Sequence, residues 1–193
     1  AGTVEHIPFD PADQGLAVLV VDTRVAHSLA DGEYGKRRAS CERAAKILGV
    51  SLLREVSIGE LPAALDRLPD DDLRRRVRHV VTEDDRVERT VSLLRQGRIA
   101  EIGELLTASH TSLRDDYEVS CAELDAAVDA ALAAGALGAR LTGGGFGGSV
   151  IALVPTGRVD PVGDAVGKAF AARGFTAPVL RRVSPAQGAR RDS

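Results

Sequence analysis

Apolar and polar residues follow two different rhythms along the chain, and together they predict a mixed α and β fold. The run Leu16–Val21 is short, rich in β-branched residues and bounded by Gly15 and Asp22, which is typical of a buried strand. The runs Ser149–Val154 and Val179–Val183 predict two further strands. Between the first and second of these strands, apolar residues recur mainly at steps of three and four, so that region is expected to be mostly helical.

Six helices are expected from this rhythm, and three details of the pattern bear on their boundaries. In the longest helical segment, Asp84 occupies a core-facing position. Thr82 and Asp85 have the spacing of an N-cap pair, so this segment is either one helix or two helices that meet near Thr82. Ser120–Glu123 has the sequence of a capping box, and Leu52–Ile58 is compatible with a short strand or a loop. The helices are expected at Tyr34–Leu48, part of Gly59–Pro69, Asp70–Gln96, Ile102–Leu113, Ala122–Leu132 and Pro161–Arg173.

Composition narrows the class of protein. The chain has 193 residues, 44% hydrophobic and 27% charged, which suits one generous globular domain or two small ones. A net charge of −3 and an aromatic content of 3% argue against nucleic-acid binding. The longest apolar runs are too short to span a membrane, which needs about 20 residues, and the N-terminus does not resemble a signal peptide.

The cysteines and the absence of methionine bear on location and completeness. Cys41 and Cys121 are 80 positions apart, so they form no metal-binding pattern and no disulfide framework, and a reducing cytoplasm is expected. The chain contains no methionine, which indicates a processed or truncated product of a longer protein.

The segment Thr142–Gly148 is the strongest local signal for chemistry, because it holds five glycines in six positions. Glycines permit positive φ and let backbone N–H groups approach a ligand such as phosphate. Gly143, Gly145 and Gly148 match the spacing of a dinucleotide-binding loop, but the pattern predicts a helix before them and a strand after them, the reverse of that motif. No Lys-Ser/Thr pair follows, so a P-loop is excluded as well. A ligand-approach loop and a tight structural turn both remain open.

Other polar groups have plain structural explanations. Asp115-Asp116 is expected to be a solvated turn before a helix, and Arg37-Arg38 and Arg74–Arg76 are expected to be solvated. Tyr34 is expected in the core with a tethered hydroxyl. The four histidines show no metal-ligand spacing and are expected to be caps or core hydrogen-bonding groups: His6, His27, His79 and His110.

Several motifs, in their order along the chain, resemble the galactokinases. The third signature of the wider GHMP kinase superfamily is similar to Arg140–Gly148, and the segment Ser109–Asp125 is similar to a stretch particular to galactokinases. The resemblance extends from about Val4 to Val183 and covers only the C-terminal half of those longer proteins. The remaining motifs that carry it are Asp22–Leu29, Glu33–Arg38, Cys41-Glu42 and Arg78–Glu83.

The resemblance implies a fold, a domain organisation and a reaction. The fold would be α+β, an antiparallel sheet packed with several helices, as in the GHMP C-terminal domain. Residues 1–26 would be a lead-in strand, open to membership of an interdomain sheet, and residues 27–193 the domain itself. The parent reaction would transfer the γ-phosphoryl group of ATP to the anomeric hydroxyl of galactose, with Mg²⁺.

The resemblance carries over few functional residues. Tyr34 matches the tyrosine that contacts galactose in the family, and the loop Thr142, Gly143, Gly144, Gly145, Phe146, Gly147 and Gly148 matches the loop beside the phosphate-binding cleft. The family's catalytic aspartate and main phosphate loop have no counterpart in this chain, so no catalytic residue and no metal ligand are assigned. The isolated chain is therefore expected to be inactive without the N-terminal half.

Two alternatives stay open. A galactokinase-like chain could sense galactose and ATP without turnover, or the sugar could be a relative such as N-acetylgalactosamine. If the strand Leu16–Val21 normally pairs with the N-terminal half, its open edge would also favour self-association.

Overall fold

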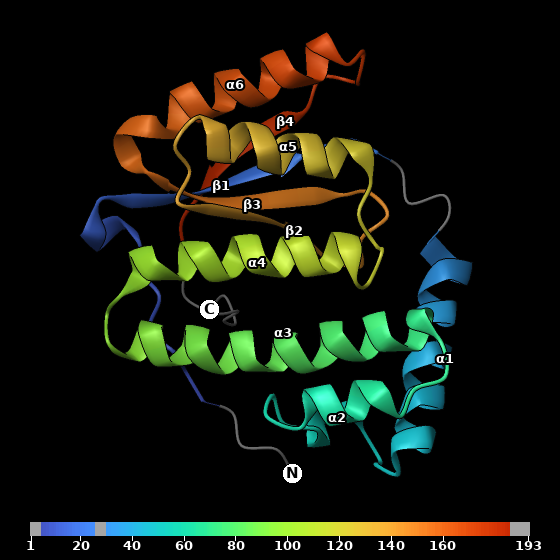
Figure 1. The fold of residues 1–193 in the computed structure, drawn as a ribbon. Helices are drawn as coiled ribbons and strands as arrows, with labels where there is room; N and C mark the ends of the chain where they lie inside the picture. Colours follow the sequence, from blue (N-terminus) through green and yellow to red (C-terminus); the bar gives the residue numbers. More distant parts are fainter. Residues whose placement is uncertain (1–4, 26–29, 186–193) are drawn as a thin grey trace, which may run out of the picture.

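The computed structural model describes residues 5–25 and 30–185, and it contains one four-stranded antiparallel sheet (Figure 1). The strands are β1 (Leu16–Asp22), β2 (Gly138–Thr142), β3 (Ser149–Pro155) and β4 (Val179–Val183), in the order β2-β3-β1-β4. In β1, every second residue faces the main core, as strand geometry requires: Leu19 pairs with Ala152, and Val21 with Val150. The expected α+β class with an antiparallel sheet is confirmed.

Six helices surround this sheet. Helices α5 and α6 lie together on one side, and α4 runs along β2 and separates the sheet from α3 (Figure 1). Helix α1 crosses the end of α3, and α2 lies against the outer side of α3 (Figure 1). Their bounds are α1 (Ala30–Leu48), α2 (Leu61–Asp66), α3 (Asp71–Arg95), α4 (Ile102–Asp115), α5 (Ala122–Ala133) and α6 (Val159–Ala172).

The apolar stripes of these helices form two main cores. The larger lies between the sheet and helices α5 and α6, where Phe170 and Leu124 are fully buried. The second joins α1, α2 and α3 around Leu68, Leu73 and Val77. Because α1 and α3 share this second core, their relative position is fixed by packing rather than by the loops between them.

Two glycines allow α4 to approach β2 closely. A Cβ atom on Gly138 would lie 1.9 Å from the carbonyl oxygen of Gly103, and a Cβ on Gly103 would lie 2.3 Å from the carbonyl oxygen of Leu137. No side chain fits at such distances, so glycine is required at both positions. This contact places α4 directly beside the strand that leads into the glycine-rich loop.

Several boundary predictions are corrected. A strand, β2, directly precedes the glycine-rich loop, where a fading helix was expected. Helix α3 is continuous through Thr82, because the Thr82 hydroxyl donates to the carbonyls of Arg78 and His79 within the helix and caps no second one. Leu52–Ile58 contains a short 3-10 turn and is a loop.

Two further expectations change. The Ser120 hydroxyl donates to the Asp125 carboxylate at 2.5 Å, and Cys121 is the N-cap residue of α5, so Ser120–Glu123 is not a capping box. Strand β1 pairs with β3 on one side and β4 on the other, so it has no open edge. The division of the chain at residue 26 stays a prediction.

Candidate functional site

The loop between β2 and β3 has an unusual backbone conformation. Gly143, Gly145, Gly147 and Gly148 all have positive φ, between 82° and 132°, and Phe146 has a φ of 60°. Since side chains rarely adopt these angles, the glycines are dictated by the path of the backbone. The loop is flanked by strands on both sides, which again excludes a dinucleotide-binding strand–loop–helix motif.

The inner part of this loop is seated on two other segments of the chain. The Phe146 N–H donates to the carbonyl of Val119 at 2.7 Å, and a Cβ atom on Gly145 would lie 2.3 Å from that same oxygen. Directly after β1, Thr23 donates to the Gly148 carbonyl twice, from its backbone N–H at 3.0 Å and from its hydroxyl at 2.7 Å. The loop is therefore fixed from below by backbone contacts that no larger residue at Gly145 could accommodate.

The outer part of the loop is open. Thr142, Gly143 and Gly144 are exposed, and a Cβ atom on either of these two glycines would meet nothing within 4 Å. Of the amides from Gly143 to Gly148, only that of Phe146 donates to a protein acceptor within the described residues. Free backbone N–H groups in a turn of alternating conformation can bind an anion such as a phosphate, so this loop has the chemistry of an anion site.

Two arginines, one partly buried and one buried, hold the turn on which the loop rests. From α1, Arg37 donates to the carbonyls of Tyr117 at 2.7 Å and Glu118 at 3.0 Å. From α3, Arg76 donates to the Asp116 carbonyl and to the Glu118 carboxylate, whose pKa it lowers. The expectation that these arginines are solvated is wrong, since their side chains are only 14% and 5% exposed.

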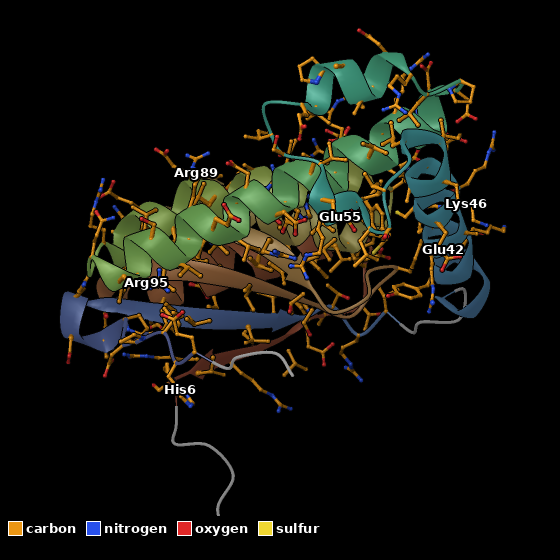
Figure 2. All side chains as sticks on the ribbon, turned by 90° about the horizontal axis from the view of Figure 1, so that it is seen from below. His6, Glu42, Lys46, Glu55, Arg89 and Arg95 are labelled. Carbon is orange, nitrogen blue, oxygen red and sulfur yellow. The ribbon has the colours of Figure 1, made fainter. Side chains whose placement is uncertain are left out.

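Other charges on the same two helices do face solvent. Figure 2 shows Glu42 and Lys46 pointing outward from α1, and Arg89 and Arg95 pointing outward from α3. Arg38, next to Arg37 in sequence, is also exposed and pairs with Glu42. Arg37 and Arg76 thus differ from these exposed residues, because their side chains are largely shielded from solvent.

A buried polar layer lies where α3 and α4 meet. The Ser112 hydroxyl donates its single proton to the Asp116 carboxylate at 3.0 Å, so it accepts a hydrogen bond from Nδ1 of His79 at 3.0 Å. This fixes His79 as the neutral Nδ1–H tautomer, and burial lowers its pKa to about 4. Asp116 also pairs with Arg78, so it is not the solvated turn residue that was expected.

A second polar cluster lies beside β2. Arg140 donates to Glu83 at 3.0 Å, and Ser109 donates to the same carboxylate at 2.6 Å. Burial raises the pKa of Glu83, but the hydrogen bonds from Ser109 and Arg86 and the charge of Arg140 outweigh it and hold that pKa below its ordinary value. This cluster ties β2 to α3 and α4 at Arg140, two residues before the loop begins.

His110 completes the support of β2. The backbone N–H of Leu141 donates to His110 Nδ1 at 3.3 Å, so Nδ1 carries no proton, and Nε2 lies 3.2 Å from the Asp125 carboxylate without good hydrogen-bond alignment. The prediction that His79 and His110 are hydrogen-bonded core residues is confirmed. His27 lies outside the described residues.

Tyr34 is not a core residue. Its side chain is 57% exposed near the start of α1, so the expectation of a buried ring with a tethered hydroxyl is wrong. It borders a pocket of about 520 Å³ that is also lined by Cys41, Tyr117 and Asp84. One carboxylate oxygen of Asp84 is buried there without a hydrogen-bond partner. The exposed ring of Tyr34 is accessible to a ligand. Tyr34 lies one helical turn before Arg37, which bonds the turn beneath the glycine loop.

The described residues offer little to a metal. No group of three or more His, Cys, Asp or Glu side chains comes together in residues 5–25 and 30–185. Cys41 and Cys121 are free thiols, and burial raises the pKa of each. Within the same ranges, no helix has the length and apolar character needed to cross a bilayer.

Sequence reasoning missed the residues that support the loop. Arg76 could have been found, because it lies three residues after Leu73 and one before Val77, on the same helical face. Arg37 gave no such signal, since its two acceptors lie 80 and 81 positions away along the chain. The loop itself, Thr142–Gly148, was found from its glycines alone.

Comparison with known proteins agrees with this architecture. The sequence pattern of the family described as "GHMP kinases C terminal" matches residues 90–172, which include α4, α5, β2, the loop and β3. Residues 90–172 are thus similar to a GHMP kinase C-terminal domain, and their fold and glycine-rich loop agree with that match.

Over most of its length, the chain is similar to galactokinases. It is 59% identical to the galactokinase of Streptomyces coelicolor over 96% of this chain and 48% of that protein. It is 50% identical to human galactokinase over 74% of this chain and 36% of that protein. The crystal structure of Lactococcus lactis galactokinase complexed with galactose superposes with a TM-score of 0.83 at 35% identity, covering 88% of this chain and 45% of that one. The chain corresponds to about half of a galactokinase.

Proposed function

We propose that this chain is the C-terminal portion of a kinase that transfers the γ-phosphoryl group of ATP to the anomeric hydroxyl of galactose, giving galactose 1-phosphate. The observation that carries the proposal is the exposed glycine loop with unpartnered amides, in a chain 59% identical to a galactokinase. Such catalysis depends mainly on positioning the reactants and stabilising charge, which a rigid loop can supply.

We assign two parts of the chain to the two substrates. The amides at Gly143 and Gly144 would donate to phosphate oxygens of ATP, because they are exposed and have no acceptor among residues 5–25 and 30–185. Tyr34 would contact the sugar, which its exposed ring supports. The remaining half of the protein would close the cleft opposite these two elements.

The metal and the catalytic base would come from that remaining half. Mg²⁺ would bridge and neutralise phosphate oxygens, but the described residues bring no set of metal ligands together. We therefore propose that this chain forms one wall of the active site and is inactive alone. Any self-association through a sheet edge would involve an outer strand, β2 or β4, since β1 is paired on both sides.

The test uses the full-length protein that contains this sequence. ADP release is measured with MgATP and either galactose, N-acetylgalactosamine or glucose, beside the isolated 193-residue chain. We expect turnover with galactose in the full-length protein only. Galactose binding without ADP release would indicate a sensor instead of an enzyme. Faster ADP release with N-acetylgalactosamine than with galactose would mean that N-acetylgalactosamine is the substrate.

A variant examines the role of Tyr34. Tyr34→Phe should raise the KM for galactose about fivefold, because loss of one hydrogen bond costs about 1 kcal/mol. The KM for ATP serves as the internal control and should not change. An unchanged KM for galactose would mean that the Tyr34 hydroxyl does not contact the sugar.

A further inference from the structure

Arg37 makes more contacts than a helix-surface arginine normally does. Its Nε donates to the Tyr117 carbonyl, one of its terminal nitrogens donates to the Glu118 carbonyl, and its guanidinium lies 6.0 Å from the centre of the Phe146 ring. Glu33, one turn earlier on α1, approaches the other terminal nitrogen at 3.4 Å. One side chain of α1 therefore bonds the turn and lies over the ring of Phe146 in the glycine loop.

The turn that Arg37 holds is strained. Glu118 has a φ of 54°, in the left-handed region that residues with side chains rarely occupy. A conformation of this kind persists only where its surroundings enforce it. The two carbonyl acceptors of Arg37 belong to Tyr117 and Glu118, so the guanidinium binds the backbone on both sides of the strained φ angle.

The residue after this strained position carries the loop. The Val119 carbonyl accepts the Phe146 N–H at 2.7 Å and lies where a Cβ atom of Gly145 would be. Rotation of the peptide at Glu118 would move Val119, and with it the acceptor of Phe146. The direction of the open amides at Gly143 and Gly144 thus depends on the bonds made by Arg37.

We infer that Arg37 is a positioning residue that couples helix α1, and with it Tyr34, to the conformation of the glycine loop. It touches no substrate; it acts through Glu118 and Val119. Its role in phosphoryl transfer rests on the proposed function, whereas its effect on the loop does not. The chemistry requires a planar fork, because a lysine ammonium cannot match the fixed geometry of two adjacent carbonyls.

The first test measures hydrogen exchange in the full-length protein that contains this segment. Arg37→Lys keeps the charge and removes the fork. Exchange at the Phe146 amide should accelerate about tenfold relative to core amides of β3, a loss of about 1.4 kcal/mol in local protection. Arg38→Lys is the matched control, because Arg38 is exposed and bonds only Glu42 in the described part of the chain. Equal exchange at Phe146 in both variants would overturn the inference.

A second variant covers the possibility that Arg37→Lys does not fold. Phe146→Leu removes the ring beneath the guanidinium and leaves both carbonyl bonds intact. Exchange at residue 146 should then change less than about threefold, since the bonds to Tyr117 and Glu118 carry the effect. A tenfold acceleration in Phe146→Leu would overturn the inference by assigning the effect to the ring contact.

Kinetics supply the readout that a merely structural role would not produce. In Arg37→Lys, we expect the KM for ATP to rise about tenfold and kcat to fall as well. The KM for galactose should change less than about twofold. Arg38→Lys should change none of these values. Equal kinetics in the two variants would contradict the coupling. Absence of any sugar phosphorylation in the unmodified protein would instead defeat the proposed function and leave the exchange result standing.

Discussion

Protonation of His79 should destabilise this domain in mild acid. The ring is only 6% exposed, stacks on Tyr117 with centroids 4.4 Å apart, and donates its Nδ1 proton to Ser112. Four charged groups face it: Glu83 and Asp116 favour the charged ring, and Arg86 and Arg140 oppose it. Burial outweighs all four, so the imidazole is held neutral.

The magnitude follows from the pKa. Burial lowers the pKa of His79 from 6.5 to about 4, and each unit corresponds to about 1.36 kcal/mol. The unfolded chain binds the proton more readily, so acid favours unfolding. The contribution is fully present above pH 6.5 and is lost as the pH falls toward 4. The free energy of unfolding should fall by about 2 kcal/mol by pH 5 and by about 3 kcal/mol in all.

The assay compares the chain with His79→Asn by urea unfolding between pH 7.5 and pH 5. Asparagine places an amide near the position of Nδ1 and does not titrate. The variant is less stable at pH 7.5, but it should lose about 2 kcal/mol less on acidification. His110, whose pKa burial also lowers, remains in both proteins, so its contribution cancels. Equal losses in both proteins, or an NMR titration of His79 near 6.5, would refute the reasoning.

Three substitutions test other contacts through the free energy of unfolding of the 193-residue chain. Gly145→Ala should lower the free energy of unfolding by about 1–3 kcal/mol, because its Cβ would meet the Val119 carbonyl. The control Gly144→Ala should change it by less than about 0.5 kcal/mol, since a Cβ there meets nothing within 4 Å. Equal effects of the two substitutions would show that the loop is not seated on Val119. Asp84→Leu should stabilise the chain by about 1 kcal/mol, because it removes the unpartnered buried oxygen, and a loss of stability would mean that this oxygen has a partner. Gly138→Ala should cost about 3 kcal/mol or more, since its Cβ would overlap the backbone of α4, and a thermal midpoint like that of the unmodified chain would contradict the close approach.

Most helices could be predicted from the sequence, because apolar residues repeat over many turns and burial follows that repeat. The first half of helix α3 shows this, since Leu73 and Val77 are buried, whereas Val87 of the same predicted stripe is 54% exposed. Strand β2 could not be predicted. The five residues Gly138–Thr142 include one β-branched side chain and two small ones, and their strand character comes from pairing with β3.

The site divides in the same way. The glycine loop could be predicted, because the backbone conformation favours glycine at four of its positions: Gly143, Gly145, Gly147 and Gly148. The general preference of tyrosine for the core predicted a buried Tyr34, which is wrong. The resemblance to a sugar-contacting tyrosine implies an accessible ring, and this agrees with the exposure observed. The partners of Arg37 and Arg76 could not be predicted, because they are backbone carbonyls, which leave no trace in residue type.

Backbone strain in the described residues is concentrated around one feature. Three residues other than glycine have positive φ, namely Arg24, Glu118 and Phe146. They belong to three segments that meet at the glycine loop: Arg24 follows the threonine bonded to the Gly148 carbonyl, and Glu118 precedes the carbonyl bonded to Phe146. Each such residue costs about 1–3 kcal/mol, so stability alone does not account for three of them at one place.

The contacts around these residues explain how the strain persists and what it achieves. Two hydrogen bonds from Thr23 and one from Phe146 fix the loop, and the forks of Arg37 and Arg76 fix the turn below it. A loop held in this way presents its open amides in one direction before any ligand arrives. Binding of a phosphate group then needs little further ordering of the backbone, which favours both affinity and the fixed alignment that phosphoryl transfer requires. If the loop binds a phosphate as we propose, its strain is the cost of holding the anion-binding surface ready.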